Sequence, residues 1–108
     1  MFSTDDTIVA VATPAGHGGI GIVRLSGPAA GSIVQRLAAR VRAWPARRVV
    51  RTTVATTVAK TDVLVTFFAA PASYTGQHVC EIAAPGNPLV LASIVAVGAY
   101  HWRRMADY

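Results

Sequence analysis

Two opposite charges stand inside apolar segments of this chain, and they are the side chains best suited to chemistry. Arg24 lies within the run 20–25, and Glu81, the only glutamate, lies within the run 79–82. Both runs have the residues typical of strands, whose side chains alternate between two faces. A charge in such a strand needs a partner or water. Arg24 and Glu81 therefore form an ion pair with each other or contact a ligand across a pocket, and the residues alone favour the ion pair.

A glycine-rich loop precedes the first of these charges. Residues 16–21 read Gly-His-Gly-Gly-Ile-Gly and match the letters of Gly-x-Gly-x-x-Gly. That dinucleotide-binding motif opens a helix and is followed by an acidic residue about 20 positions later. Here a strand-like run follows, and the next acidic residue is Asp62. The glycines instead allow a sharp turn, or a close approach of the backbone to a ligand or a partner chain.

Other catalytic chemistry has little support in the sequence. The three histidines lie far apart, so no metal site is expected. Ser26 and Ser73 have no evident base that would activate a nucleophile. Lys60, the only lysine, is not preceded by the Gly-x-x-x-x-Gly of a phosphate loop. We therefore expect neither a GTP site nor intrinsic catalysis, and Cys80, the only cysteine, is expected to be a buried thiol.

The composition indicates a folded domain with an apolar surface. Of the 108 residues, 53% are hydrophobic and only 14% are charged. This predicts a single domain over residues 1–108 and a surface that a second copy covers, as a homodimer. No apolar run reaches the ~20 residues of a membrane span. Asp5 and Asp6 stand where a secretory signal carries positive charge, so we expect a cytoplasmic protein without membrane contact.

The net charge of +5 is concentrated in one part of the sequence. Six arginines lie within sixteen residues: Arg36, Arg40, Arg42, Arg47, Arg48 and Arg51. Such a cluster can meet RNA phosphates. A solvated helix face and loop is the alternative, and the residues favour it because no aromatic ladder accompanies the arginines.

The elements that position these residues follow from hydrophobic periodicity. Strands are predicted at residues 7–12, 20–25, 49–58, 62–68, 79–82 and 101–105. One helix is predicted to begin at Pro28 and to end before Trp44, and a second is predicted over 88–97 with Gly98 as its stop. The order β, β, α, β, β, β, α, β indicates a compact α+β domain with a small mixed sheet and two helices.

Two segments together resemble the amino-terminal domain of the MnmE family of tRNA-modifying GTPases, also called TrmE. The first is residues 6–28, which include the glycine-rich loop and Arg24. The second is residues 71–82, which read Pro-Ala-Ser-Tyr-Thr-Gly-Gln-His-Val-Cys-Glu-Ile. Their order and spacing follow the family, and they cover about a third of the chain. The resemblance implies the α+β fold of that domain, without the helical and GTPase domains that follow it in the family.

The resemblance also implies a function and a ligand. It implies binding of 5-formyltetrahydrofolate or a related reduced folate, the one-carbon source for modifying the wobble uridine of tRNA. Arg24 and Glu81 match positions that contact this folate, so the resemblance favours ligand contacts over the ion pair. Tyr74 stands where the family usually has phenylalanine and could form an aromatic wall, and Gly18 and Gly19 belong to the loop beside the pocket. The implied partners are a second copy of the chain, a MnmG-type flavoprotein and tRNA.

Two other interpretations stay open. One is a basic accessory protein that contacts RNA through the arginine cluster, and the other is an inactive fragment of the enzyme. Departures from the family pattern support the second of these. Residues 84–88 read Ala-Pro-Gly-Asn-Pro where the family typically has Gly-His-Gly-Gly-Pro, and residues 103–108 replace a segment that reads Arg-Pro-Gly-Glu-Phe in the family.

Overall fold

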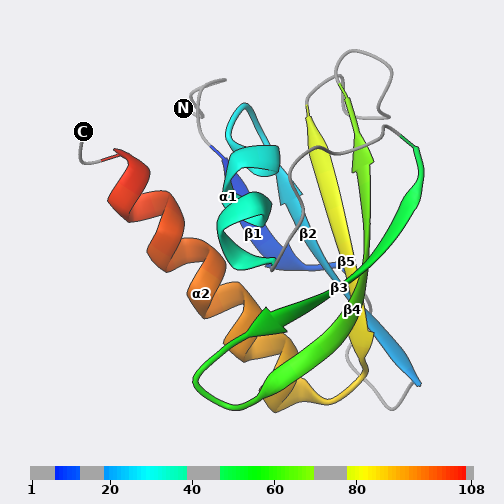
Figure 1. Cartoon of the computed structure of the whole chain (residues 1–108). Coiled ribbons are helices and arrows are strands. Elements are labelled where there is room, and N and C mark those ends of the chain that lie inside the picture. Colours follow the sequence, from blue (N-terminus) through cyan, green and yellow to red (C-terminus); the bar gives the residue numbers. More distant parts are fainter. Residues whose placement is uncertain (1–6, 13–18, 39–46, 70–77, 107–108) are drawn as a thin grey trace.

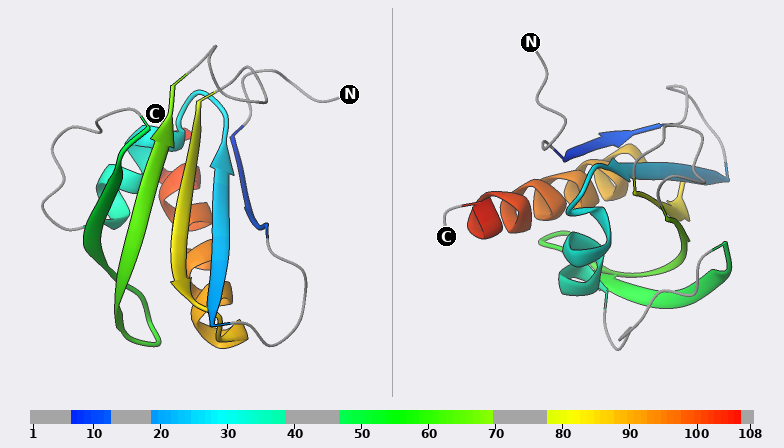
Figure 2. Two further views of the ribbon diagram at one scale, coloured as in Figure 1. Left: turned by 90° about the vertical axis from the view of Figure 1, so that its right-hand side faces the viewer. Right: turned by 90° about the horizontal axis from the view of Figure 1, so that it is seen from above.

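The computed structural model describes residues 7–12, 19–38, 47–69 and 78–106, in which one five-stranded sheet carries two helices on the same face (Figure 1). The elements in chain order are β1 (Ile8–Val11), β2 (Ile20–Ser26), α1 (Ala30–Leu37), β3 (Val49–Ala55), β4 (Lys60–Phe68), β5 (Val79–Pro85) and α2 (Pro88–Ala106). The left view of Figure 2 looks onto the face of the sheet that the helices leave open. We call this the open face.

The strand order is β1-β2-β5-β4-β3, and every pairing among these strands is antiparallel. The predicted α+β class is confirmed, while the sheet is antiparallel rather than mixed. The reason lies in the connections. The crossover through α1 carries the chain from β2 to β3 at the opposite edge, and β4 and β5 then fill the gap by reversing direction at each step. No two parallel strands become neighbours in this arrangement.

The core lies between the sheet and the two helices and follows the alternation of the strands. In β2 the positions Gly21, Val23 and Leu25 are buried beneath the helices, whereas Ile22 and Arg24 lie on the open face. The same alternation in β4 and β5 completes the sheet side of the core. The largest fully buried side chains of this core are Val23, Leu25, Ile33, Val34, Val54, Val65, Cys80, Ile82 and Ile94.

Helix α1 packs through the apolar positions that the sequence pattern predicts. Its residues Ile33, Val34 and Leu37 are buried. The chain turns into the helix at Gly27, whose φ of 138° disfavours a side chain. The hydroxyl of Thr7 accepts a hydrogen bond of 3.0 Å from the backbone N–H of Ala29, which fixes the start of the helix against the beginning of β1. The helix ends at Leu37, earlier than predicted.

Helix α2 is longer than the sequence analysis predicted. The predicted stop at Gly98 and the predicted strand at residues 101–105 are both wrong, because α2 continues to Ala106. A Cβ on Gly98 would lie 3.1 Å from Cγ1 of Val9, so this glycine lets β1 approach the helix. Gly98 therefore allows close packing in the middle of the helix and does not end the helix as a left-handed cap residue. At the other end, the Asn87 side chain accepts a hydrogen bond of 2.8 Å from the N–H of Leu89 and caps the helix.

The single cysteine belongs to this core. Cys80 is fully buried and free, as the sequence indicated. Burial raises the pKa of its thiol to about 12, because an apolar environment disfavours the thiolate. Cys80 therefore packs as a small apolar side chain and is not a nucleophile at neutral pH.

We expect the Gly21→Ala variant to be destabilised by about 1–3 kcal/mol, the usual cost of overpacking a core. A Cβ at Gly21 would lie 2.5 Å from Cδ1 of Leu91, so the Leu91 side chain must move out of its buried position on α2. Urea denaturation measures the difference. Gly19→Ala is the matched control, since a Cβ there has nothing within 4 Å. Equal unfolding midpoints for the two variants would contradict this packing of α2 against β2.

Candidate functional site

The two charges singled out by the sequence meet each other across neighbouring strands. Arg24 of β2 lies directly opposite Glu81 of β5 in the antiparallel register. The Nε and Nη2 atoms of Arg24 donate hydrogen bonds of 2.9 and 2.6 Å to the same oxygen, Oε2 of Glu81. The Arg24 side chain is 36% exposed and that of Glu81 is 23% exposed. The ion pair that the residues alone favoured is therefore present, and both partners stay accessible from the open face.

The carboxylate of Glu81 keeps one oxygen available. Both donors from Arg24 bind Oε2, and within the described part of the chain Oε1 accepts no hydrogen bond. No buried side-chain oxygen in these residues is unsatisfied, so Oε1 is in contact with solvent. A ligand with N–H donors could bind Oε1 while Arg24 holds Oε2. The ion pair then orients the carboxylate for the ligand, and the two interpretations of these charges do not exclude each other.

Apolar and small side chains surround the pair on the open face. The cross-strand row that contains it consists of Val49, Thr66, Glu81, Arg24 and Ala10. The next row toward the Pro85 end of β5 places Leu64, Ala83 and Ile22 side by side. The side chains next to the pair are thus mainly small or apolar, and Arg51 continues the second row beyond Leu64. Such surroundings suit a flat ligand with a few polar edges.

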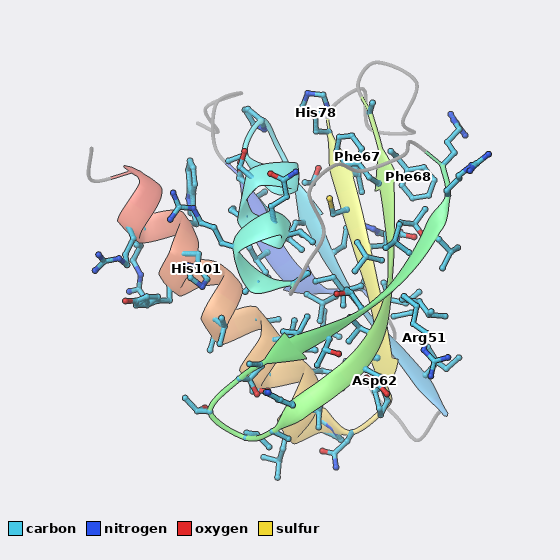
Figure 3. All side chains as sticks on the ribbon, in the orientation of Figure 1. Arg51, Asp62, Phe67, Phe68, His78 and His101 are labelled. Atoms are coloured by element: carbon cyan, nitrogen blue, oxygen red, sulfur yellow. The ribbon has the colours of Figure 1, made fainter. Side chains whose placement is uncertain are left out.

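Phe68 is an aromatic neighbour that the sequence analysis missed. It lies opposite Val79, one row from Glu81 and on the same face, and it is half-buried. The guanidinium carbon of Arg47 lies 6.0 Å from the centre of its ring. On the helix side of the sheet, Phe67 stacks against His78 with ring centres 5.6 Å apart. Figure 3 shows Phe67, Phe68 and His78 together at this end of the strands. Alternation along β4, combined with its pairing to β5, is the signal that would have indicated Phe68.

The remaining predicted ligand residues are not brought to the pair by the described structure. Gly19 lies at the opposite end of β2, where its carbonyl accepts a hydrogen bond of 3.2 Å from the N–H of Gly86. Five residues of extended chain separate it from Arg24, roughly 16 Å. Gly18 and Tyr74 lie outside the described residues. The site defined by the structure is therefore Arg24 and Glu81, with Phe68 and Thr66 beside them.

The arginine stretch is divided by the fold. Arg36 lies on α1, on the helix side of the sheet. The side chains of β3 alternate between the two faces of the sheet, and that of Arg51 lies on the open face, opposite Leu64. Figure 3 shows Arg51 and Asp62 on the strands, away from α1. Arg40 and Arg42 lie outside the described residues. The arginines that are close in sequence therefore do not form one continuous patch in the described parts of the chain.

The described residues provide neither a cluster of metal ligands nor a membrane-spanning helix. Within them, no three side chains of the His, Cys, Asp or Glu type are grouped so that they could hold a metal ion. None of the helices placed there is long and apolar enough to cross a membrane.

We expect a coupling free energy of about 1 kcal/mol between Arg24 and Glu81 in a double-mutant cycle with Arg24→Met and Glu81→Gln. A coupling free energy of this size is at the upper end of the range for exposed ion pairs. The reason is that two N–H groups bind one carboxylate oxygen in a partly buried place. Urea denaturation at low and high salt measures it, and salt should reduce the coupling. Arg51→Met with Glu81→Gln is the control cycle. An Arg24–Glu81 coupling no larger than this control would show that the pair does not stabilise the fold.

Comparison with known proteins identifies the family of the chain. The family described as GTP-binding protein TrmE N-terminus matches residues 7–108. The tRNA modification GTPase MnmE of Francisella philomiragia is 44% identical over 104 residues, which are 96% of this chain and 23% of that protein. The protein of the same name from Koribacter versatilis is 41% identical over 109 residues, which are 95% of this chain and 24% of that protein.

The match thus extends over nearly all of the chain, while the chain spans about a quarter of the length of these relatives. The strand with Arg24 and the strand with Glu81 both lie inside the matched region. On this evidence the chain belongs to the family of TrmE amino-terminal domains.

Proposed function

We propose that this chain is the folate-binding and dimerising module of a tRNA-modifying system that acts on the wobble uridine. Membership of the TrmE amino-terminal family supports the role in tRNA modification. The observation that carries the ligand proposal is the Arg24–Glu81 pair, which leaves Oε1 of Glu81 accessible on an open, mostly apolar face. The ligand is 5-formyltetrahydrofolate or a related reduced folate.

The chemistry of a reduced folate fits these groups. A pterin edge carries an amino group and a ring N–H, and the two lone pairs of the accessible Oε1 of Glu81 can accept hydrogen bonds from both. The guanidinium of Arg24 fixes the carboxylate and can also face a carbonyl oxygen of the ligand. The ring of Phe68, one row away on the same face, offers an apolar surface for the pterin. Gly18, Gly19 and Tyr74 remain proposed ligand contacts by family resemblance.

The open face also supports the proposed homodimer. Four large apolar side chains on it are substantially exposed: Ile8, Ile20, Val49 and Leu64. Single exposed apolar residues are common, but several on one unoccupied sheet face favour association. A second copy that covers this face would also enclose the surroundings of Glu81 and so exclude water from the ligand.

The partner, substrate and location that we propose for the module also come from the family resemblance. A MnmG-type flavoprotein is the proposed catalytic partner, tRNA the proposed substrate, and the cytoplasm the proposed location. The relatives are GTPases by name, and the family resemblance implies that nucleotide hydrolysis belongs to another domain. We propose no GTP site for the residues of this chain.

Substitution of Glu81 should weaken folate binding. Glu81→Ala removes the acceptor for the pterin edge, a loss of roughly 1.5–3 kcal/mol for a charge-assisted contact, hence about tenfold or more in affinity. Arg24→Ala should cost a similar amount. Calorimetric titration with 5-formyltetrahydrofolate measures the affinities. Asp62→Asn is the matched control, because Asp62 is an exposed acid of β4 whose carboxylate accepts only a 3.3 Å hydrogen bond from Thr53 on that sheet.

Two results of this titration would contradict the ligand proposal. If the unmutated chain releases no heat at millimolar folate, the Arg24–Glu81 pair is structural only and the inactive-fragment interpretation gains support. If binding is weakened equally by Asp62→Asn and Glu81→Ala, the effect is one of net charge rather than contact with Glu81.

Substitutions on the open face should dissociate the dimer. We expect the unmutated chain to sediment as a dimer at micromolar concentration and the variant Ile20→Gln/Leu64→Gln to sediment as a monomer, because two apolar contacts are lost from the covered surface. Leu89→Gln on α2 is the control, since Leu89 is 71% exposed but lies on the helix layer. A monomeric unmutated chain would overturn the proposal, and dissociation by Leu89→Gln alone would place the interface on α2.

A further inference from the structure

A second charged surface lies on the helix side of the molecule, where the end of α2 meets α1. It consists of Arg36 from α1 with Tyr100, His101, Arg103 and Arg104 from α2. We call it the helix-end surface. The three arginines are exposed, and Tyr100 is 46% exposed. The sequence analysis did not connect Arg36 with the last turns of α2, because it ended this helix at Gly98.

Helical spacing makes Arg103 and Arg104 the i+3 and i+4 neighbours of Tyr100, while His101 lies further round the helix on the other side of Arg104. Tyr100 and Arg104 are four residues apart and share a face, and the guanidinium carbon of Arg104 lies 5.7 Å from the centre of the Tyr100 ring. His101 meets the same ring edge-on, with ring centres 5.3 Å apart. Trp102 points the other way and packs against the core. The tyrosine ring is thus held between a cation and an imidazole at the surface.

Acidic side chains of the described residues lie on one side of the molecule only, whereas cations lie on both sides, with Arg24 and Arg51 on the open face. The acidic side chains in that part of the chain are Asp62 and Glu81, and both lie on the open face. Ion pairing there is between Arg24 and Glu81, so Arg36, Arg103 and Arg104 have no acidic partner among the described residues. Asp107 lies outside them. The described charges of the helix-end surface are therefore all positive.

His101 reports these charges. Its pKa lies below the ordinary value, first because the ring is partly removed from water and then because the cations Arg36 and Arg104 disfavour a further positive charge. The two arginines come from different helices, so α1 and α2 both direct positive charge at this imidazole. A bound anion would act in the opposite direction.

We propose that the helix-end surface binds the phosphate backbone of RNA, with Tyr100 stacking on an unpaired base. Exposed arginines from two helices provide phosphate contacts, and an exposed aromatic ring flanked by a cation provides the sequence-tolerant stacking platform of single-stranded segments. The choice of RNA over other polyanions rests on the proposed function in tRNA modification. The surface is separate from the folate site, since the sheet lies between them.

The test is binding of a fluorescent, unmodified tRNA transcript by the whole chain, followed by anisotropy at several salt concentrations. Arg103→Gln/Arg104→Gln should weaken binding about tenfold or more at about 50 mM salt and lower the slope of log K against log salt by about 2, because two phosphate contacts are lost. Arg36→Gln should lower the slope by about 1. Tyr100→Leu should weaken binding about fivefold or more while leaving the slope unchanged.

The matched control is Arg48→Gln/Arg51→Gln, which removes the same charge from exposed arginines of the sequence cluster. Little change in this control supports the helix-end surface. An equal loss of affinity in both double variants overturns the proposal in favour of an effect of net charge. A loss of affinity in the control alone moves the RNA contact to Arg48 and Arg51. All the substituted side chains are exposed, and thermal unfolding checks that the variants fold.

His101 provides a second readout that does not depend on affinity. Its pKa, measured from the imidazole resonances in NMR spectra, should rise when RNA binds, because phosphate replaces the unfavourable field of Arg36 and Arg104 with a favourable one. An unchanged His101 pKa in saturating RNA overturns the proposal. So does binding of vesicles rich in phosphatidylserine by a chain that does not bind RNA. Failure of folate binding, in contrast, leaves these RNA measurements unaffected, so the two proposals fail separately.

Discussion

The in-register pairing of β2 with β5 is the interaction on which the rest of the structure depends. It places Val23 opposite Ile82 and Leu25 opposite Cys80 beneath the helices, and in the same step it places Arg24 opposite Glu81 on the open face. A slip of one residue in either strand would turn a charge into the core and an apolar side chain outward. Because burying an unpaired charge costs several kcal/mol, the two charges that form the candidate site also fix the register of the central strands.

Much of this could be derived from the sequence, because strands with one buried face show a clear alternation. The five strands of the sheet, the buried face of α1 and the embedded charges Arg24 and Glu81 followed from that pattern, whereas the strand predicted at residues 101–105 did not form. The pattern also indicated an ion pair, whereas the family resemblance favoured a ligand. The geometry accommodates both, since Arg24 occupies one carboxylate oxygen of Glu81 and leaves the other. The alternation of residues thus predicted the ion pair, and the family resemblance favoured a ligand contact by the same two side chains.

The parts that could not be predicted depend on contacts between segments distant in sequence. Gly98 has the signature of a helix stop, but its reason is the close approach of Val9 from β1, which the order of residues does not reveal. Phe68 joins the site only because β4 pairs with β5. The arginine cluster suggested one basic patch, but alternation in β3 sends Arg51 to the open face while α1 keeps Arg36 on the other. In each case tertiary packing overrides a correct local pattern.

The sheet separates the two surfaces to which function is assigned, and that separation has a physical consequence. A ligand at Glu81 lies on the open face, and a polyanion at the end of α2 lies beyond the helix layer, so the sheet and the packed core stand between them. Neither occupant blocks the other. Any influence of one on the other must pass through the packing of α2 on the sheet. The closest such contacts are Leu91 over Gly21 and Val9 against Gly98. Both glycines belong to the sequence for reasons of packing, and through them the position of α2 is tied to the strand that carries Arg24.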